Sequence, residues 1–287
     1  MTGGRTPPRV LDDFDRLGAE LSGARRLLCC LDFDGTLAPI VESPGDATMP
    51  AETEAALDQL IDTSGLSIAI VSGRRLADLE RRVDVPVTLA GNHGLELNRD
   101  GRRAIHPIAA VRQRSISAVC RALQSRLSSI PGARVEHKGL TATVHVRTVP
   151  PANRSSVREI TTSAVDELAA GDLEWSTGKR VIEITPALDW GKGDAVELIE
   201  SDMPTGTRTI VVGDDETDEH GFAAVEPDGV SVFVGEERPS HASWRVHGPS
   251  DVTALLTWLA RHGTPALESS SCGLSAGSSF EPCHVKR

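Results

Sequence analysis

Residues 26–36 read RLLCCLDFDGT, an apolar run that ends in two aspartates separated by one residue. A short and nearly continuous apolar run predicts a strand that is buried on both faces of a parallel sheet. In an extended segment Asp32 and Asp34 project to the same side, and Gly35 permits a sharp turn directly after them. Two carboxylates at this spacing can have different catalytic roles, one attacking a substrate and the other transferring protons.

Two later segments repeat this order of apolar strand and polar turn. Residues 66–71 (LSIAIV) and 209–212 (TIVV) predict further buried strands. The first precedes Ser72-Gly73-Arg74, and the second precedes the acidic run GDDETD at 213–218. Helical patterns separate the strands, so the sequence predicts an α/β fold with a Rossmann-like parallel sheet. Ligands of such sheets bind at the carboxyl ends of the strands, where all three polar clusters are expected.

The pattern changes within residues 101–186. Two helical segments and two hairpins occur there, and the hairpin strands alternate polar with apolar residues, which predicts an antiparallel sheet with one exposed face. We therefore expect an inserted α+β cap domain at 101–186, within a discontinuous core domain of residues 10–100 and 187–263. Residues 1–9 are predicted to be a flexible N-terminus and residues 264–287 a disordered tail, because both are polar and rich in Gly, Pro or Ser.

Charge and composition narrow the range of partners. The formal net charge of −11 argues against a nucleic-acid partner, since binding to phosphate backbones requires basic patches. No apolar run approaches the roughly 18 residues of a membrane span, and the N-terminal residues lack the apolar region of a secretory signal. We expect a cytoplasmic protein that binds neither nucleic acid nor membrane.

Each polar cluster, taken alone, has a purely structural alternative. The DFDGT segment at 32–36 could be a turn or an N-cap, and Ser72-Gly73-Arg74 a strand-to-helix connection. Residues 213–218 could be a capped helix start, because acids favour helix N-termini. Their occurrence together, each after a predicted strand, favours a functional site. Hydroxyl groups and turn amides suit phosphate oxygens, and clustered carboxylates suit Mg²⁺.

These motifs resemble those of the haloacid dehalogenase (HAD) superfamily of phosphatases, on residues 32–37, Ser72, Lys192 and 213–215. The inserted module resembles the α+β cap that one branch of this superfamily carries between its second and third motifs. Several segments further resemble the trehalose-6-phosphate phosphatase family, and the similarity extends over roughly residues 28–260. They are LDFDGTLAPI (31–40), VSGR (71–74), GNHGLEL (91–97), VEHKGLTATVHVR (135–147), GKRVIEITP (178–186), DWGKG (189–193) and GDDETDE (213–219).

The resemblance implies a magnesium-dependent phosphatase that hydrolyses trehalose 6-phosphate through an aspartyl-phosphate intermediate. Asp32 would be the nucleophile, Asp34 the general acid and base, and Ser72 and Lys192 would hold the transferring phosphoryl group. Lys192 taken alone is ordinary, because a lysine near a helix start is usually solvated. The implied magnesium ligands are Asp32, the backbone carbonyl of Asp34, and Asp214, with Asp215 or Asp218 in support.

The predicted cap sheet carries a polar face. Without the resemblance, its charges could simply form cross-strand ion pairs on a solvated surface. The resemblance instead implies that they bind sugar hydroxyls. The substrate-binding residues that it implies in the cap are Glu136, Lys138, Lys179 and Glu183. Arg74, Asn92 and His93 are further candidates, and the loop of Asn92 and His93 is expected to face the crevice. His93 has a structural alternative as a hydrogen-bonding residue of its loop.

Three functions remain open from the sequence. The first is hydrolysis of trehalose 6-phosphate, with a trehalose-phosphate synthase as a possible pathway partner. The second is hydrolysis of another sugar phosphate, such as sucrose phosphate or a glucosylglycerol-type phosphate. The third is a non-catalytic sugar-phosphate sensor, which the paired aspartates argue against, since a sensor needs no nucleophile.

Overall fold

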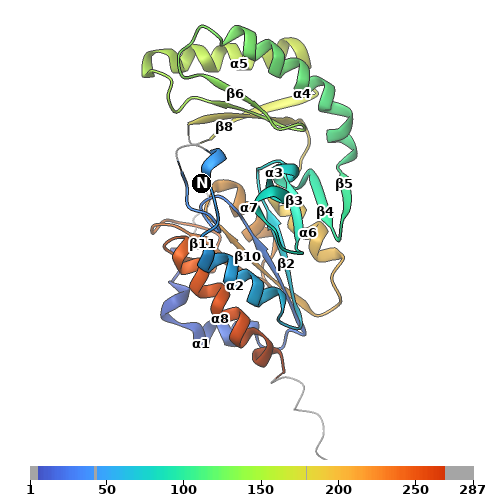
Figure 1. Ribbon diagram of the computed structural model, residues 1–287, viewed down its shortest axis with the longest axis vertical. Coiled ribbons are helices and arrows are strands. Elements are labelled where there is room, and N and C mark those ends of the chain that lie inside the picture. The colour runs from blue at the N-terminus through green and yellow to red at the C-terminus, as the bar shows by residue number, and fades with distance from the viewer. Residues whose placement is uncertain (1–5, 42–43, 179, 269–287) are drawn as a thin grey trace, which may run out of the picture.

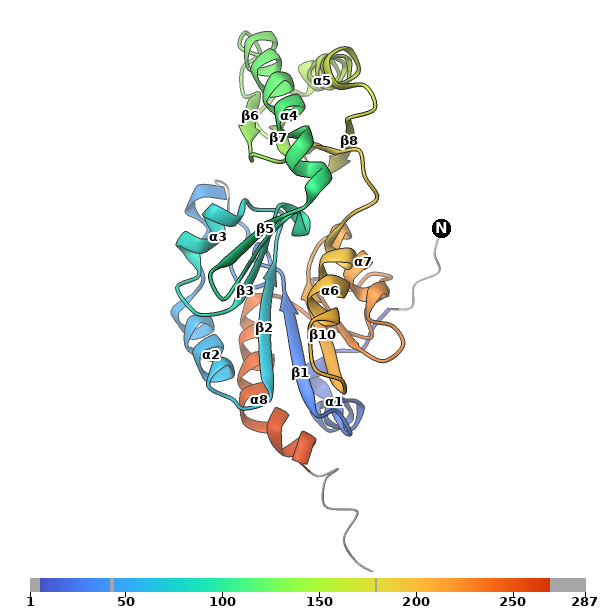
Figure 2. The same cartoon turned by 90° about the vertical axis from the view of Figure 1, so that its right-hand side faces the viewer.

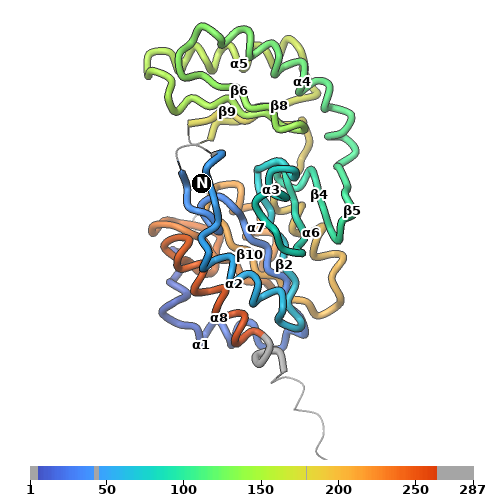
Figure 3. The backbone as a smooth tube through the Cα atoms, in the orientation of Figure 1, coloured from blue at the N-terminus to red at the C-terminus, as the bar shows by residue number. Residues whose placement is uncertain are grey.

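The computed structural model describes residues 6–41, 44–178 and 180–268. The described chain forms a core and a cap that lie one above the other along the long axis of the molecule (Figure 1). The chain enters the cap after residue 106 and returns to the core before residue 192 (Figure 3). The cap is therefore an insertion into the core.

An eight-stranded sheet forms the centre of the core, in the order β12-β11-β10-β1-β2-β3-β4-β5. All neighbours from β12 to β3 pair in parallel, and β4 and β5 add an antiparallel hairpin at one edge of the sheet. The strands are β1 (Arg26–Leu31), β2 (Leu66–Val71), β3 (Thr88–Gly91), β4 (Glu96–Arg99), β5 (Arg102–Ile105), β10 (Thr207–Gly213), β11 (Val230–Val234) and β12 (Trp244–Val246).

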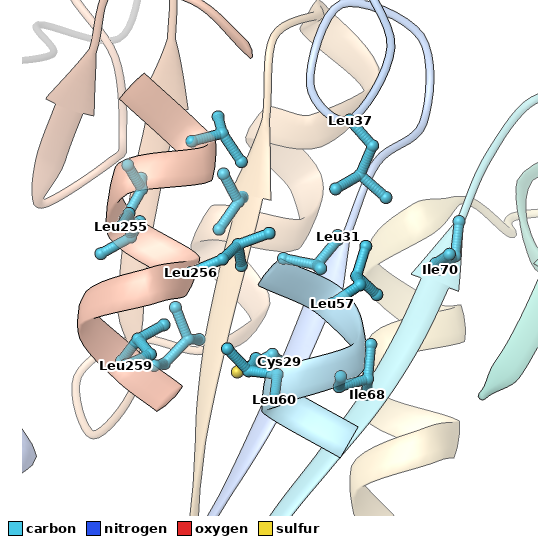
Figure 4. Packing of buried hydrophobic residues seen from close by; sticks show 14 of the residues in the cluster. Cys29, Leu31, Leu37, Leu57, Leu60, Ile68, Ile70, Leu255, Leu256 and Leu259 are labelled. Carbon is cyan, nitrogen blue, oxygen red and sulfur yellow. The ribbon is translucent and has the colours of Figure 1, made fainter. Parts of the chain in front are cut away.

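Helices cover both faces of this sheet (Figure 2). On one face lie α1 (Phe14–Leu21), α2 (Ala51–Ile61), α3 (Leu76–Arg82) and α8 (Pro249–Glu268), and on the other α6 (Lys192–Ser201) and α7 (Glu216–Ala224). Cys29 and Leu31 of β1 pack in the first layer, against leucines of α2 and α8 (Figure 4), whereas Leu28 and Cys30 pack in the second. Burial on both sides explains why β1 has no polar side chain after its first residue.

The cap consists of one four-stranded antiparallel sheet and two long helices. The strand order is β6-β7-β9-β8, with β6 (Arg134–His137), β7 (Ala142–His145), β8 (Leu173–Gly178) and β9 (Val181–Pro186). Helices α4 (Pro107–Arg126) and α5 (Arg154–Ala169) lie on the outer face and share a buried apolar cluster with the strands. The opposite face of the sheet is directed toward the core (Figure 1).

Several predicted boundaries differ from the structure. The core sheet continues to Ile105 rather than to residue 100, because β5 pairs with β4. The expected tail at 264–287 begins too early, since α8 extends to Glu268; residues 269–287 lie outside the described residues. Of the N-terminal residues expected to be flexible, Pro7 and Pro8 accept hydrogen bonds from Arg245 and therefore pack against β12. Within the described residues, no helix is both long and apolar enough to span a membrane.

Candidate active site

Three carboxylates meet at the carboxyl ends of two neighbouring strands. Asp32 directly follows β1, Asp214 directly follows β10, and Asp218 lies in the first turn of α7. One carboxylate oxygen from each lies within 4.8 Å of those of the other two. Gly35 makes this approach possible, because its φ is +87° and a Cβ there would lie 2.4 Å from an oxygen of Asp214. The turn after Asp34 thus requires glycine both for its conformation and for space.

Lys192, the first residue of α6, lies between two of these carboxylates. Its Nζ is 2.8 Å from Asp32 Oδ1 and 2.7 Å from Asp218 Oδ1, and all three side chains are buried. Burial alone would lower the pKa of Lys192, but the charges of Asp218 and Asp32 raise it. Burial raises the pKa of Asp32; the ammonium of Lys192 opposes this shift, and Asp218 and Asp214 add to it. The cluster therefore contains three carboxylates and one ammonium, which contacts two of them.

This donor set fits a divalent cation. Three close carboxylates with one ammonium leave an excess of negative charge, and Mg²⁺ prefers hard oxygen ligands of this kind. Asp215 is placed differently, because it is the N-cap of α7 and its Oδ1 accepts a hydrogen bond from the Glu216 amide at 2.9 Å. Within the described residues, the acidic cluster comprises Asp32, Asp214 and Asp218.

Asp34 occupies a more open position than Asp32. Its side chain is 40% exposed, whereas that of Asp32 is 6% exposed. Arg74 binds Asp34 in a bidentate manner, with Nε and Nη2 each 2.6 Å from one carboxylate oxygen. The same guanidinium donates to Asp78 through Nη1 at 2.6 Å. The structure thus places Arg74, an expected substrate-binding residue, against the expected general acid.

Ser72 follows β2, the neighbour of β1. Register pairs Leu31 with Ile70, so Ser72 and Asp32 leave adjacent strands at the same edge of the sheet. The hydroxyl oxygen of Ser72 accepts a hydrogen bond from the Arg74 amide at 3.3 Å. Buried hydroxyl and loop amides are suited to bind phosphoryl oxygens beside a nucleophile.

A row of polar side chains crosses the cap sheet on the face directed toward the core. Glu136, Thr143, Glu183 and Ser176 are paired in register across β6, β7, β9 and β8. Thr143 donates to Glu183 at 3.4 Å, and Glu136 lies 2.7 Å from Nε2 of His145. The sequence alone does not indicate Ser176 as a candidate, because only the register of the β8–β9 hairpin places it opposite Glu183.

Glu183 also connects the cap with the core. Its Oε2 lies 3.6 Å from Nε2 of His93, which belongs to the short 3-10 turn η3 (Asn92–Gly94) of the core. Burial would raise the pKa of Glu183, but the neighbouring His93 ring and the positive charge of Lys138 lower it to about 2. Glu183 is therefore ionised at neutral pH and presents a carboxylate between the cap and the core.

The other residues that the sequence predicts to bind substrate are Lys138, Asn92 and Lys179. Lys138 lies in the β6–β7 turn, and its Nζ donates to the Gly73 carbonyl at 3.1 Å. Asn92 is fully buried, and its side chain is bonded to Glu96, Lys138 and Thr141. Lys179 lies outside the described residues.

A parallel-sheet core with two aspartates after β1 and a cap inserted after β5 defines the capped HAD class. Within this class, the family model described as Trehalose-phosphatase matches residues 30–250. The chain therefore belongs to the trehalose-phosphatase family, which confirms the resemblance and the fold class predicted from the sequence.

Individual relatives agree with this assignment. A trehalose-phosphate phosphatase of Mycobacterium marinum is 38% identical over 242 residues, which cover 80% of this chain and 60% of the relative. One from Mycobacterium tuberculosis is 34% identical over 271 residues, covering 91% of this chain and 68% of the relative. The C-terminal domain of the Candida albicans trehalose-6-phosphate phosphatase has the same fold, with a TM-score of 0.72, 24% identity and coverage of 91% and 99%. The chain thus spans only about 60% of the length of the first of these relatives.

Proposed function

We propose that this protein hydrolyses trehalose 6-phosphate to trehalose and inorganic phosphate. The observation that carries the proposal is the buried group of Asp32, Lys192 and Asp218 at the strand ends, beneath a cap face with ionised Glu183. The first part is suited to attack a phosphate, and the second is suited to bind a ligand rich in hydroxyl groups. The reaction would use the product of a trehalose-phosphate synthase. We infer that this protein is cytoplasmic.

The chemistry follows from the positions of the two aspartates. Asp32 attacks phosphorus, and the bond between phosphorus and the sugar oxygen breaks as Asp34 gives its proton to that oxygen. Asp34 then takes a proton from a water molecule that attacks the phosphorus of the aspartyl phosphate. Phosphate leaves and the carboxylate of Asp32 is restored. Lys192 and Ser72 hold the phosphoryl oxygens during both steps.

Magnesium is the metal that this site would hold. Its ligands would be the carboxylates of Asp32, Asp214 and Asp218, together with the backbone carbonyl of Asp34. When bound, it would offset the repulsion between a carboxylate and a phosphate dianion.

The test of this function is a phosphate-release assay on a panel of sugar phosphates. We expect release from trehalose 6-phosphate with magnesium, far slower release from sucrose phosphate and glucosylglycerol phosphate, and loss of activity in excess chelator. Preference for another sugar phosphate would contradict the proposed substrate but not the proposed reaction mechanism. Binding of trehalose 6-phosphate without any release would instead support a sensor.

Glu183 offers a prediction specific to the sugar. Glu183→Gln should lower kcat/KM for trehalose 6-phosphate by roughly ten- to a hundredfold, because a charged hydrogen bond contributes about 1.5–3 kcal/mol. It should change hydrolysis of a small aryl phosphate less than about twofold, since that substrate does not reach the cap. Steady-state kinetics on both substrates measures the difference.

A matched control is Glu159→Gln, which alters an exposed glutamate on α5. It should leave both rates unchanged. Equal losses on the two substrates in Glu183→Gln would mean that Glu183 supports the core site rather than sugar binding.

A further inference from the structure

The side chain of Asn92 forms hydrogen bonds with both the core and the cap. Its Nδ2 group donates to Glu96 Oε2 at 2.7 Å and to the backbone carbonyl of Lys138 at 3.1 Å. Its Oδ1 accepts from the hydroxyl of Thr141 at 2.6 Å. Asn92 and Thr141 are both buried. Both hydrogens of the amide are thus engaged, one toward the core and one toward the cap.

The core side of this connection is tied to the predicted phosphate-binding loop. The backbone amide of Asn92 donates to the Arg74 carbonyl at 2.6 Å. The backbone amide of His93 donates to the Ser72 carbonyl at 2.9 Å. Asn92 and His93 have φ angles of 49° and 59°, a left-handed conformation that asparagine and histidine adopt more readily than most residues. A Cβ on Gly73 would lie 2.7 Å from the His93 ring, so the two loops are closely interlocked.

The cap side of the connection is the turn between β6 and β7. Lys138 contributes its backbone carbonyl to Asn92, and its own Nζ reaches back to the Gly73 carbonyl. The Lys138 charge also helps to keep Glu183 ionised. A turn bound in this way holds the charged groups of the cap at a fixed position relative to the phosphate-binding loop.

We propose that the side chains of Asn92 and Thr141, with the Lys138 carbonyl, form a cap latch that positions the cap on the phosphate-binding loop. This inference rests on the proposed function. It makes Asn92 a positioning residue, which acts on the substrate through Lys138 and Glu183 rather than by contact. Asn92 and Thr141 therefore govern how well the enzyme recognises the sugar, not how it cleaves the phosphate ester.

The test removes one hydroxyl without changing the shape of the side chain. Thr141→Val deprives Asn92 of the hydrogen bond to Oδ1, and Thr141→Ser restores the hydroxyl. We expect Thr141→Val to reduce kcat/KM for trehalose 6-phosphate about tenfold, mainly through KM, with aryl phosphate hydrolysis within about twofold of wild type. Thr141→Ser should recover most of the loss. Backbone amides of residues 138–141 should exchange hydrogen faster in Thr141→Val.

Thr161→Val is the matched control, because Thr161 is a buried cap threonine whose hydroxyl donates to the Val157 carbonyl of the same helix, α5. It should leave both kinetics and the exchange of 138–141 unchanged. If Thr141→Val folds poorly, Thr141→Ser and Thr141→Ala are compared on the same two substrates.

Equal losses on both substrates, or unchanged exchange at 138–141, would overturn the latch. Failure of the proposed function has a separate signature, since the wild type would then release no phosphate from trehalose 6-phosphate. In that case the exchange of 138–141 in Thr141→Val still decides whether the latch exists.

Discussion

The Asp32→Asn variant is expected to release no measurable phosphate from trehalose 6-phosphate. An amide cannot form the acyl phosphate, and loss of a nucleophile in other hydrolases lowers kcat by roughly a millionfold. The fold should persist, because the amide fills the same space and Lys192 keeps Asp218 as an ion-pair partner. Rapid quench with substrate labelled in the phosphate measures the intermediate directly. Wild-type protein should carry the label, and Asp32→Asn should carry none.

Asp34→Asn is the companion variant. Loss of acid–base catalysis should slow turnover by about a hundred- to ten-thousandfold. With an aryl phosphate, whose leaving group needs no proton, Asp34→Asn should still acquire the label and then retain it, because water is no longer activated. Label on Asp32→Asn, or near-normal turnover in either variant, would contradict the assigned roles.

The parallel strands of the core could be predicted because they are buried on both faces. Such strands appear in the sequence as short apolar runs, as β1 and β2 do. The β4–β5 hairpin gave no such run, since β5 is an exposed edge strand. A signal did exist at its turn, where Asp100-Gly101 has the positive φ angles typical of a two-residue hairpin connection.

The site residues divide in a similar way. Asp32, Ser72 and Asp214 could be located because each follows a recognisable strand. Lys192 could be assigned only by resemblance, since a sequence does not reveal that a lysine at a helix start is buried between two carboxylates.

The sequence predicts that Asn92 contacts substrate, and in the structure its side chain is bonded to Glu96, Lys138 and Thr141. Two of these partners belong to the cap, and they meet Asn92 only because of how the cap sits on the core. No local pattern in the sequence contains that relation, so the positioning role emerged only from the structure.

Lys192→Met is expected to destabilise the protein as well as to inactivate it. Removing the ammonium leaves Asp32 and Asp218 buried without their counter-charge, and breaking a buried ion pair from one side typically costs about 3–5 kcal/mol. Urea unfolding of wild type and variant in excess chelator measures this cost as a change in the free energy of unfolding. Turnover should be lost in parallel, because the phosphoryl oxygens lose a charged donor.

The double variant Lys192→Met/Asp218→Asn separates the two consequences. It removes one of the uncompensated charges, so it should recover much of the lost stability without recovering turnover. Magnesium should raise the free energy of unfolding of Lys192→Met more than that of wild type, because the cation replaces the missing positive charge beside the carboxylates. An unchanged free energy of unfolding in Lys192→Met would mean that Asp32 and Asp218 do not depend on Lys192 for their charge balance. The excess negative charge that favours a metal at this site would then be smaller than their geometry indicates.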